Sequence, residues 1–95
     1  MGDLMLKLVL YTPEGGSVVL GYGHTLEELD VLDQLWSDAF QWWERCQEMG
    51  YISGFKHSLE AVFLLYQTFE TDLRMFAEDE QGNKINPERY NYRGE

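Results

Sequence analysis

The sequence contains one cysteine, Cys46, and two histidines, His24 and His57, among its 95 residues. One cysteine cannot form a disulfide within the chain, which points to a reducing environment. The histidines and the cysteine are spaced too irregularly along the chain for a zinc site. The acidic run at 78–80 lacks the residue order of a calcium-binding loop. We therefore predict no metal site and no cofactor.

Long apolar segments are also missing. No run approaches the roughly 20 residues that a membrane-spanning helix needs. The first eleven residues, MGDLMLKLVLY, lack the basic start and the small-residue cleavage site of a signal peptide. Leucine stands at position 6, where a myristoylation motif requires serine or threonine. We therefore expect a cytoplasmic protein that does not bind membranes.

Basic residues are scarce. Seven lysines and arginines stand against 17 acids, and the formal net charge is −10. The acids concentrate in residues 27–48 and 59–80, where each segment contains a single base. Nucleic-acid binding relies on basic residues that displace counterions from phosphates, so direct nucleic-acid binding is not expected. The charge predicts a basic protein surface as the partner.

Two apolar patterns with a period of two open the chain. Residues 4–11 place a leucine at every second position, and residues 17–23 read as another strand. Pro13, Gly15 and Gly16 supply the turn between them. The pattern predicts a β-hairpin with strands 4–11 and 17–23. Its leucine face requires a covering layer, because a two-stranded hairpin is marginally stable alone.

Residues 25–50 predict one long amphipathic helix. Thr25 and Glu28 form a capping box at its start, and Gly50 provides a stop. Its central apolar stripe consists of Leu29, Leu32, Trp36, Ala39, Trp43 and Cys46. This stripe is widened by Val31, Leu35, Trp42 and Met49 on one side and by Phe40 on the other. So wide an apolar arc predicts packing against both the leucine face and a second helix.

Residues 58–76 repeat apolar positions at helical spacing, with Ser58 as the N-cap. The short connection 51–57 predicts that the two helices are antiparallel neighbours. Leu64 and Met75 point away from the apolar stripe of this helix, so the chain's own tail or a partner should cover them. The turn signal QGN leaves an alternative open, a small hairpin near 74–86 with the helix ending near residue 72.

The predicted fold is therefore α+β, an N-terminal β-hairpin packed on two long antiparallel amphipathic helices with a small C-terminal appendage. We expect one compact domain over residues 1–86, because Asn86 and Pro87 mark a break. Residues 87–95 form a tail in which tyrosines and arginines alternate. This tail is either a frayed end or an arm that binds a partner.

No catalytic pattern is present. Cys46 lies on the apolar stripe, where it is typical of a small core residue. Gly16 and Gly21 have the spacing of a phosphate-binding loop, but Tyr22 stands where that motif requires lysine. The histidines are interpreted as a loop residue and a cap-region residue. We predict that the protein is not an enzyme.

The candidate partner-binding residues lie mainly opposite the apolar arc of the first helix. Its acids form either a solvated face or a ladder of charges that imitates nucleic acid, and Trp42 is either the rim of the core or an exposed anchor. The candidates are Glu27, Asp30, Asp33, Asp38, Trp42, Glu44, Glu48, Leu64, Met75, Tyr90 and Tyr92.

These features predict a small acidic, non-enzymatic protein-binding module, an inhibitor that occupies the basic, nucleic-acid-binding surface of a partner. In size, acidity and lack of catalytic residues the chain resembles the small acidic inhibitors that phages and mobile elements encode. The alternative is a structural or assembly subunit. Such a subunit would form a homodimer through the second helix or an edge of the hairpin.

Overall fold

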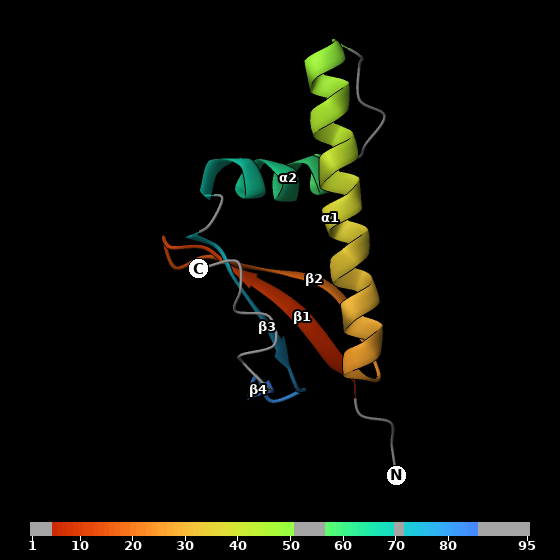
Figure 1. Cartoon of the computed structure of the whole chain (residues 1–95). Helices are drawn as coiled ribbons and strands as arrows, with labels where there is room; N and C mark the ends of the chain where they lie inside the picture. Colours follow the sequence, from red (N-terminus) through yellow and green to blue (C-terminus); the bar gives the residue numbers. More distant parts are fainter. Residues whose placement is uncertain (1–4, 51–56, 70–71, 86–95) are drawn as a thin grey trace.

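The computed structural model describes residues 5–50, 57–69 and 72–85. The element order is β1 (Leu6–Tyr11), β2 (Ser17–Gly23), α1 (Leu26–Met49), α2 (His57–Phe69), β3 (Arg74–Glu78) and β4 (Lys84–Ile85). Figure 1 shows the sheet beside the N-terminal half of α1, with α2 lying across the C-terminal half of α1 and the last turns of α1 extending beyond both. The fold class is α+β, as predicted.

The predicted hairpin is confirmed, and it forms part of a four-stranded antiparallel sheet. The strand order is β2-β1-β3-β4, so β1 lies between β2 and β3. The β1–β2 turn is closed by the N–H of Thr12, which donates to the carbonyl of Gly16 at 3.0 Å. Gly15 adopts a φ of 94°, which only glycine reaches readily.

The predicted helix over 58–76 is wrong beyond Phe69. Residues 74–78 form β3, which pairs along β1 with Leu10 opposite Met75. In this segment the period-two alternation decides the structure: Leu73, Met75 and Ala77 are fully buried, while Arg74 on the other face is exposed. Because α2 has only 13 residues, the predicted pair of two long antiparallel helices is also wrong.

The alternative prediction, a small hairpin near 74–86, is confirmed: β3 and β4 pair antiparallel. Its turn is held by the carboxylate of Asp79, which accepts hydrogen bonds of 2.9 Å from the N–H groups of Gln81 and Asn83. Gly82 adopts a φ of 86° in the same turn. The hairpin is not an appendage, however, since β3 pairs directly with β1 in the body of the sheet.

The core lies between the leucine face of the sheet and the two helices. Its buried members are Leu6, Leu8, Leu10, Leu20, Leu29, Val62, Tyr66, Leu73, Met75 and Ala77. The indole N–H of Trp36 donates to the carbonyl of Leu20 at 3.1 Å and joins α1 to β2. The prediction that this face of the hairpin carries a covering layer is therefore confirmed.

Both predicted ends of α1 are confirmed. The hydroxyl of Thr25 accepts from the N–H of Glu28 at 3.1 Å, and the carboxylate of Glu28 accepts from the N–H of His24 at 2.6 Å. Gly50 ends the helix in the left-handed conformation, with a φ of 77°. At 1.5 Å per residue, the 24 residues of α1 form a rod about 36 Å long.

Candidate protein-binding surface

Only one side of the wide apolar arc of α1 faces the core. Leu29 and Trp43 are buried, whereas Leu32, Trp36 and Phe40 are half-buried. The Trp43 indole lies 5.5 Å from the Phe63 ring of α2, and its N–H donates to Glu60 at 3.3 Å. Since α2 lies across α1 instead of alongside it, α2 covers a short segment of the arc. The predicted packing of α1 against both the leucine face and the second helix is confirmed, but these two neighbours leave one side of the arc uncovered.

The other side of the arc forms an exposed apolar ridge. The ridge consists of Val31, Leu35, Trp42 and Met49, whose side chains are 56–62% exposed. Their spacings of four, seven and seven residues keep them on one side of α1, because seven residues advance an α-helix by nearly two turns. Of the two interpretations of Trp42, the structure supports the exposed one. Large aromatic side chains of this kind are common anchors in protein interfaces.

A hollow of about 270 Å³ lies at the middle of the ridge. Among the described residues it is lined by Asp38, Gln41, Trp42 and Arg45. Asp38 accepts a hydrogen bond of 2.9 Å from the side-chain amide of Gln34. In the described part of the chain, no carboxylate lies within ion-pair distance of Arg45. The hollow therefore combines an exposed indole with one charge of each sign.

A second, apolar hollow of about 130 Å³ opens between α1 and α2. It is lined by Leu32, Leu35, Trp36, Ala39, Leu59 and Phe63. Leu35 belongs both to this hollow and to the ridge, so the two apolar surfaces are continuous. On α2, Leu64 is 51% exposed.

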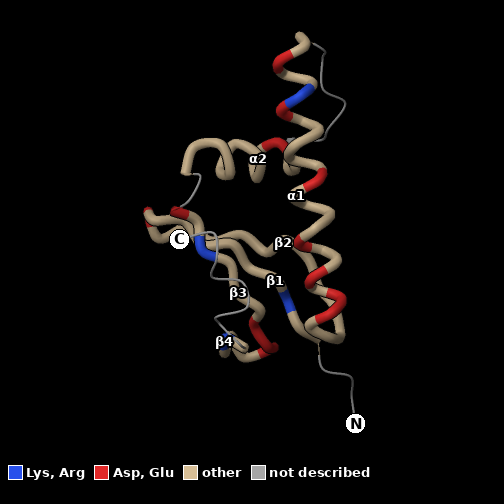
Figure 2. Tube along the Cα trace, viewed as in Figure 1, with Lys and Arg blue, Asp and Glu red and all other residues tan. Residues whose placement is uncertain are grey.

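The six acids proposed for α1 differ in exposure. Glu27, Asp38 and Glu48 are exposed, whereas Asp30, Asp33 and Glu44 are half-buried. Figure 2 shows acids along the whole length of α1 with a single basic position, Arg45.

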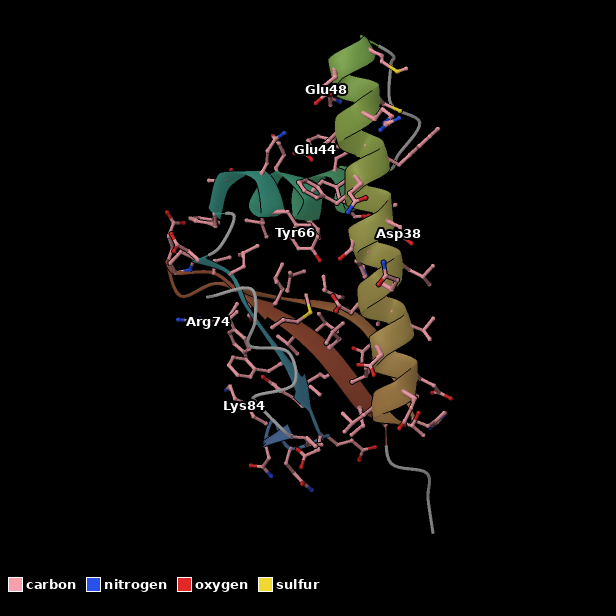
Figure 3. The ribbon with its side chains drawn as sticks, viewed as in Figure 1. Asp38, Glu44, Glu48, Tyr66, Arg74 and Lys84 are labelled. Carbon is pink, nitrogen blue, oxygen red and sulfur yellow. The ribbon has the colours of Figure 1, made fainter. Side chains whose placement is uncertain are left out.

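These acids do not share one face of the helix. Figure 3 shows Glu44 and Glu48 on the side of α1 from which α2 extends, and Asp38 on the other side. Asp30, Glu44 and Glu48 fall within about 40° of each other at 100° per residue. We name these three residues the acidic strip.

Three other candidate residues are not on this surface. Met75 is fully buried, and its assignment as an exposed contact is wrong, because it lies on β3 with its side chain in the core. Tyr90 and Tyr92, together with the predicted boundary after residue 86, lie outside the described residues.

The sequence reasoning missed Arg45 and three of the four ridge residues as contact candidates. The available signal was the seven-residue repeat of Leu35, Trp42 and Met49, which is typical of a helix–helix seam. That repeat was attributed to the core because it borders the buried stripe.

The opposite face of the sheet contains a compact polar cluster. Glu78 is only 4% exposed, accepts a hydrogen bond from the Tyr11 hydroxyl and lies 4.0 Å from the Lys84 ammonium. That ammonium is 5.0 Å from the ring centroids of both Tyr11 and Phe76. The hydrogen bond to Glu78 raises the pKa of Tyr11 from 10.0 to about 12, so this phenol stays protonated at alkaline pH values where a free tyrosine ionises. The Tyr11 hydroxyl and the Lys84 ammonium compensate for the burial of the Glu78 carboxyl group. We therefore assign this cluster a structural role.

Within residues 5–50, 57–69 and 72–85, no three His, Cys, Asp or Glu side chains gather closely enough to hold a metal ion. Neither helix in that part of the chain combines the length and apolar character needed to cross a bilayer. No family model matches the sequence, and comparison with curated proteins and with solved structures finds no similar chain.

Proposed function

We propose that this protein is a non-enzymatic protein-binding module that engages a basic surface of a partner through the acidic strip of α1. The observation that carries the proposal is the placement of the strip. Glu44 and Glu48 lie in the last turns of α1, which extend beyond the sheet and α2 (Figures 1 and 3). Carboxylates on a protruding helix can approach a concave surface that the body of the domain could not enter.

Basic concave surfaces of this kind are typical of proteins that bind nucleic acid, because such proteins neutralise phosphates with lysine and arginine. A partner whose groove is occupied by α1 would be blocked from its nucleic acid. Complementary charge would also accelerate the encounter between the two proteins. The proposed activity is thus inhibition by occupancy of the basic groove.

The test is affinity capture from a lysate of the cells that encode the chain, followed by mass spectrometry. The strip variant reverses three charges, Asp30→Lys, Glu44→Lys and Glu48→Lys. A matched control reverses three acids away from α1, Glu14→Lys, Asp72→Lys and Glu80→Lys, all of which are exposed. Both variants change the net charge equally, so only the position of the charge differs. Circular dichroism establishes that both variants fold.

We expect the wild type and the matched control to capture the same nucleic-acid-binding protein, and the strip variant to lose it. Raising the salt concentration should release that protein, since exposed charges are screened. Equal capture by the strip variant and the control would contradict the proposal, as would capture that does not depend on salt.

A further inference from the structure

We infer that the apolar ridge is an interface between two copies of this chain, in which the two α1 helices pair antiparallel about a two-fold axis between residues 41 and 42. The inference concerns the ridge and the hollow at its centre, not the acidic strip, so it extends beyond the proposed function. It differs from self-association through Leu64 and Met75, because Met75 is buried.

The ridge is self-complementary about its own middle. Leu35 and Met49 lie seven residues on either side of Trp42, and Asp38 and Arg45 are centred between residues 41 and 42. In an antiparallel pair related by a two-fold axis, residues equally distant from the centre face each other. About the axis between residues 41 and 42, Leu35 lies opposite position 48 of the second copy, within one residue, or about 1.5 Å along the helix, of Met49. This contact lies beside the apolar hollow between α1 and α2. Two indoles, one from each copy, meet near the axis.

The charges at the hollow select this orientation. Asp38 and Arg45 lie on the same side of the ridge, about 10 Å apart along α1 at 1.5 Å per residue. Antiparallel pairing places Asp38 opposite Arg45 of the second copy and repeats that contact on the other side of the axis. Parallel pairing would place Asp38 against Asp38 and Arg45 against Arg45. Like charges that face each other oppose association.

The described residues that line the hollow have the spacing that the same packing requires. Its lining residues, Asp38, Gln41, Trp42 and Arg45, stand at positions i, i+3, i+4 and i+7. Four residues at this spacing form the hole that receives a side chain in knobs-into-holes packing between helices. The hole is centred between residues 41 and 42, where the charge pair is also centred. Trp42 of the second copy is the side chain that reaches it.

In the described part of the chain, the sheet packs on a side of α1 away from the ridge. Trp36, on the core side of α1, lies about 120° around the helix from Trp42, and the acidic strip lies about as far around in the other direction. In the pair, both sheets therefore lie on one side and both acidic strips on the opposite side. A dimer would thus present two strips together, which would strengthen the engagement of a basic partner by avidity.

Sedimentation equilibrium of the full chain tests the pairing. Loading concentrations from about 5 µM to about 500 µM bracket dissociation constants between micromolar and millimolar. The variants are Asp38→Arg, Arg45→Asp, an equimolar mixture of the two, and the double exchange Asp38→Arg/Arg45→Asp. We expect the wild type to dimerise and each single variant to associate at least about 10-fold more weakly, because its own charges then face each other. The mixture and the double exchange should recover the wild-type association.

If overall charge repulsion governed the association, the Asp38→Arg variant would give a different result from the one expected above. Asp38→Arg makes the protein less acidic, so an association governed by overall repulsion would become tighter in that variant. A wild type that remains monomeric over the whole range would overturn the inference. It would also be overturned if the mixture associated no better than the single variants. The strip variant shows whether dimerisation and partner binding are independent. It should dimerise like the wild type even if it captures no basic partner.

Discussion

A Cβ atom added to Gly21 would lie 2.5 Å from the Cδ2 atom of Leu32, closer than real side chains approach. Gly21 lies on β2 and Leu32 on the first half of α1, so the missing side chain allows the helix to lie directly on the sheet. This contact, together with the Trp36–Leu20 hydrogen bond, determines which side of α1 is buried. The ridge is exposed as a consequence.

The Gly21–Leu32 contact predicts a coupled pair of substitutions. Gly21→Ala should reduce the free energy of unfolding by about 1–3 kcal/mol, the usual cost of overpacking a well-filled site. In a Leu32→Ala background the same substitution should cost much less, because the colliding methyl group is absent. Urea denaturation of the four proteins in the cycle measures both effects. Equal costs in the two backgrounds would show that the helix does not rest on this glycine.

Several local features could be predicted from the sequence because short-range chemistry specifies them. Thr25 and Glu28 define the start of α1, Gly50 defines its end, and the leucine alternation defines β1. The C-terminal half was harder, since Leu73 and Phe76 also fit the helical repeat of α2. What makes Arg74–Glu78 a strand is its pairing with β1, which lies more than 60 residues away in the sequence. The local sequence does not reveal such a long-range partner, so it could not decide between the period-two alternation and the helical repeat.

The surface of α1 was predictable only in part for a related reason. Periodicity shows that a helix has a wide apolar arc, but it does not show how much of that arc its neighbours cover. The coverage depends on the direction of α2 relative to α1, and that direction is set by tertiary packing. The sequence alone therefore leaves Trp42 between two interpretations and gives no reason to single out Arg45.

Substitution by alanine should reduce the free energy of unfolding strongly at Met75 and hardly at all at Leu64. Met75→Ala should lower the free energy of unfolding by about 2–5 kcal/mol, because it removes a fully buried side chain from β3. Leu64→Ala, at an exposed position of α2, should change it by no more than about 0.5 kcal/mol. Thermal and urea denaturation provide the comparison. Similar losses from both variants would contradict the placement of residues 74–78 in the sheet.

The Tyr11–Glu78 hydrogen bond predicts a loss of stability at alkaline pH. The pKa of Tyr11 is raised from 10.0 to about 12 in the folded protein, first through the hydrogen bond to Glu78 and then through burial. A raised folded-state pKa contributes stability that is fully present below pH 10 and is lost as the pH rises toward 12.

The variant Tyr11→Phe should consequently lose less stability between pH 10 and pH 12 than the wild type does. Urea denaturation at a series of pH values measures the difference, and the ultraviolet absorbance of the phenolate follows the titration directly. If both proteins lost stability in parallel over this interval, the tyrosine would not be the group responsible.

That α1 is the docking element of this protein is tested most directly by the distance between spin labels on two copies. With Cys46→Ser as background, one label is placed at Glu27→Cys and, in a separate protein, at Glu48→Cys; both positions are exposed. Antiparallel pairing about residues 41 and 42 predicts label separations along the helix axis of about 44 Å at position 27 and about 20 Å at position 48, at 1.5 Å per residue. Pulsed dipolar spectroscopy that finds this difference supports the pairing. Equal separations at the two positions, or no dipolar signal between copies, would contradict it.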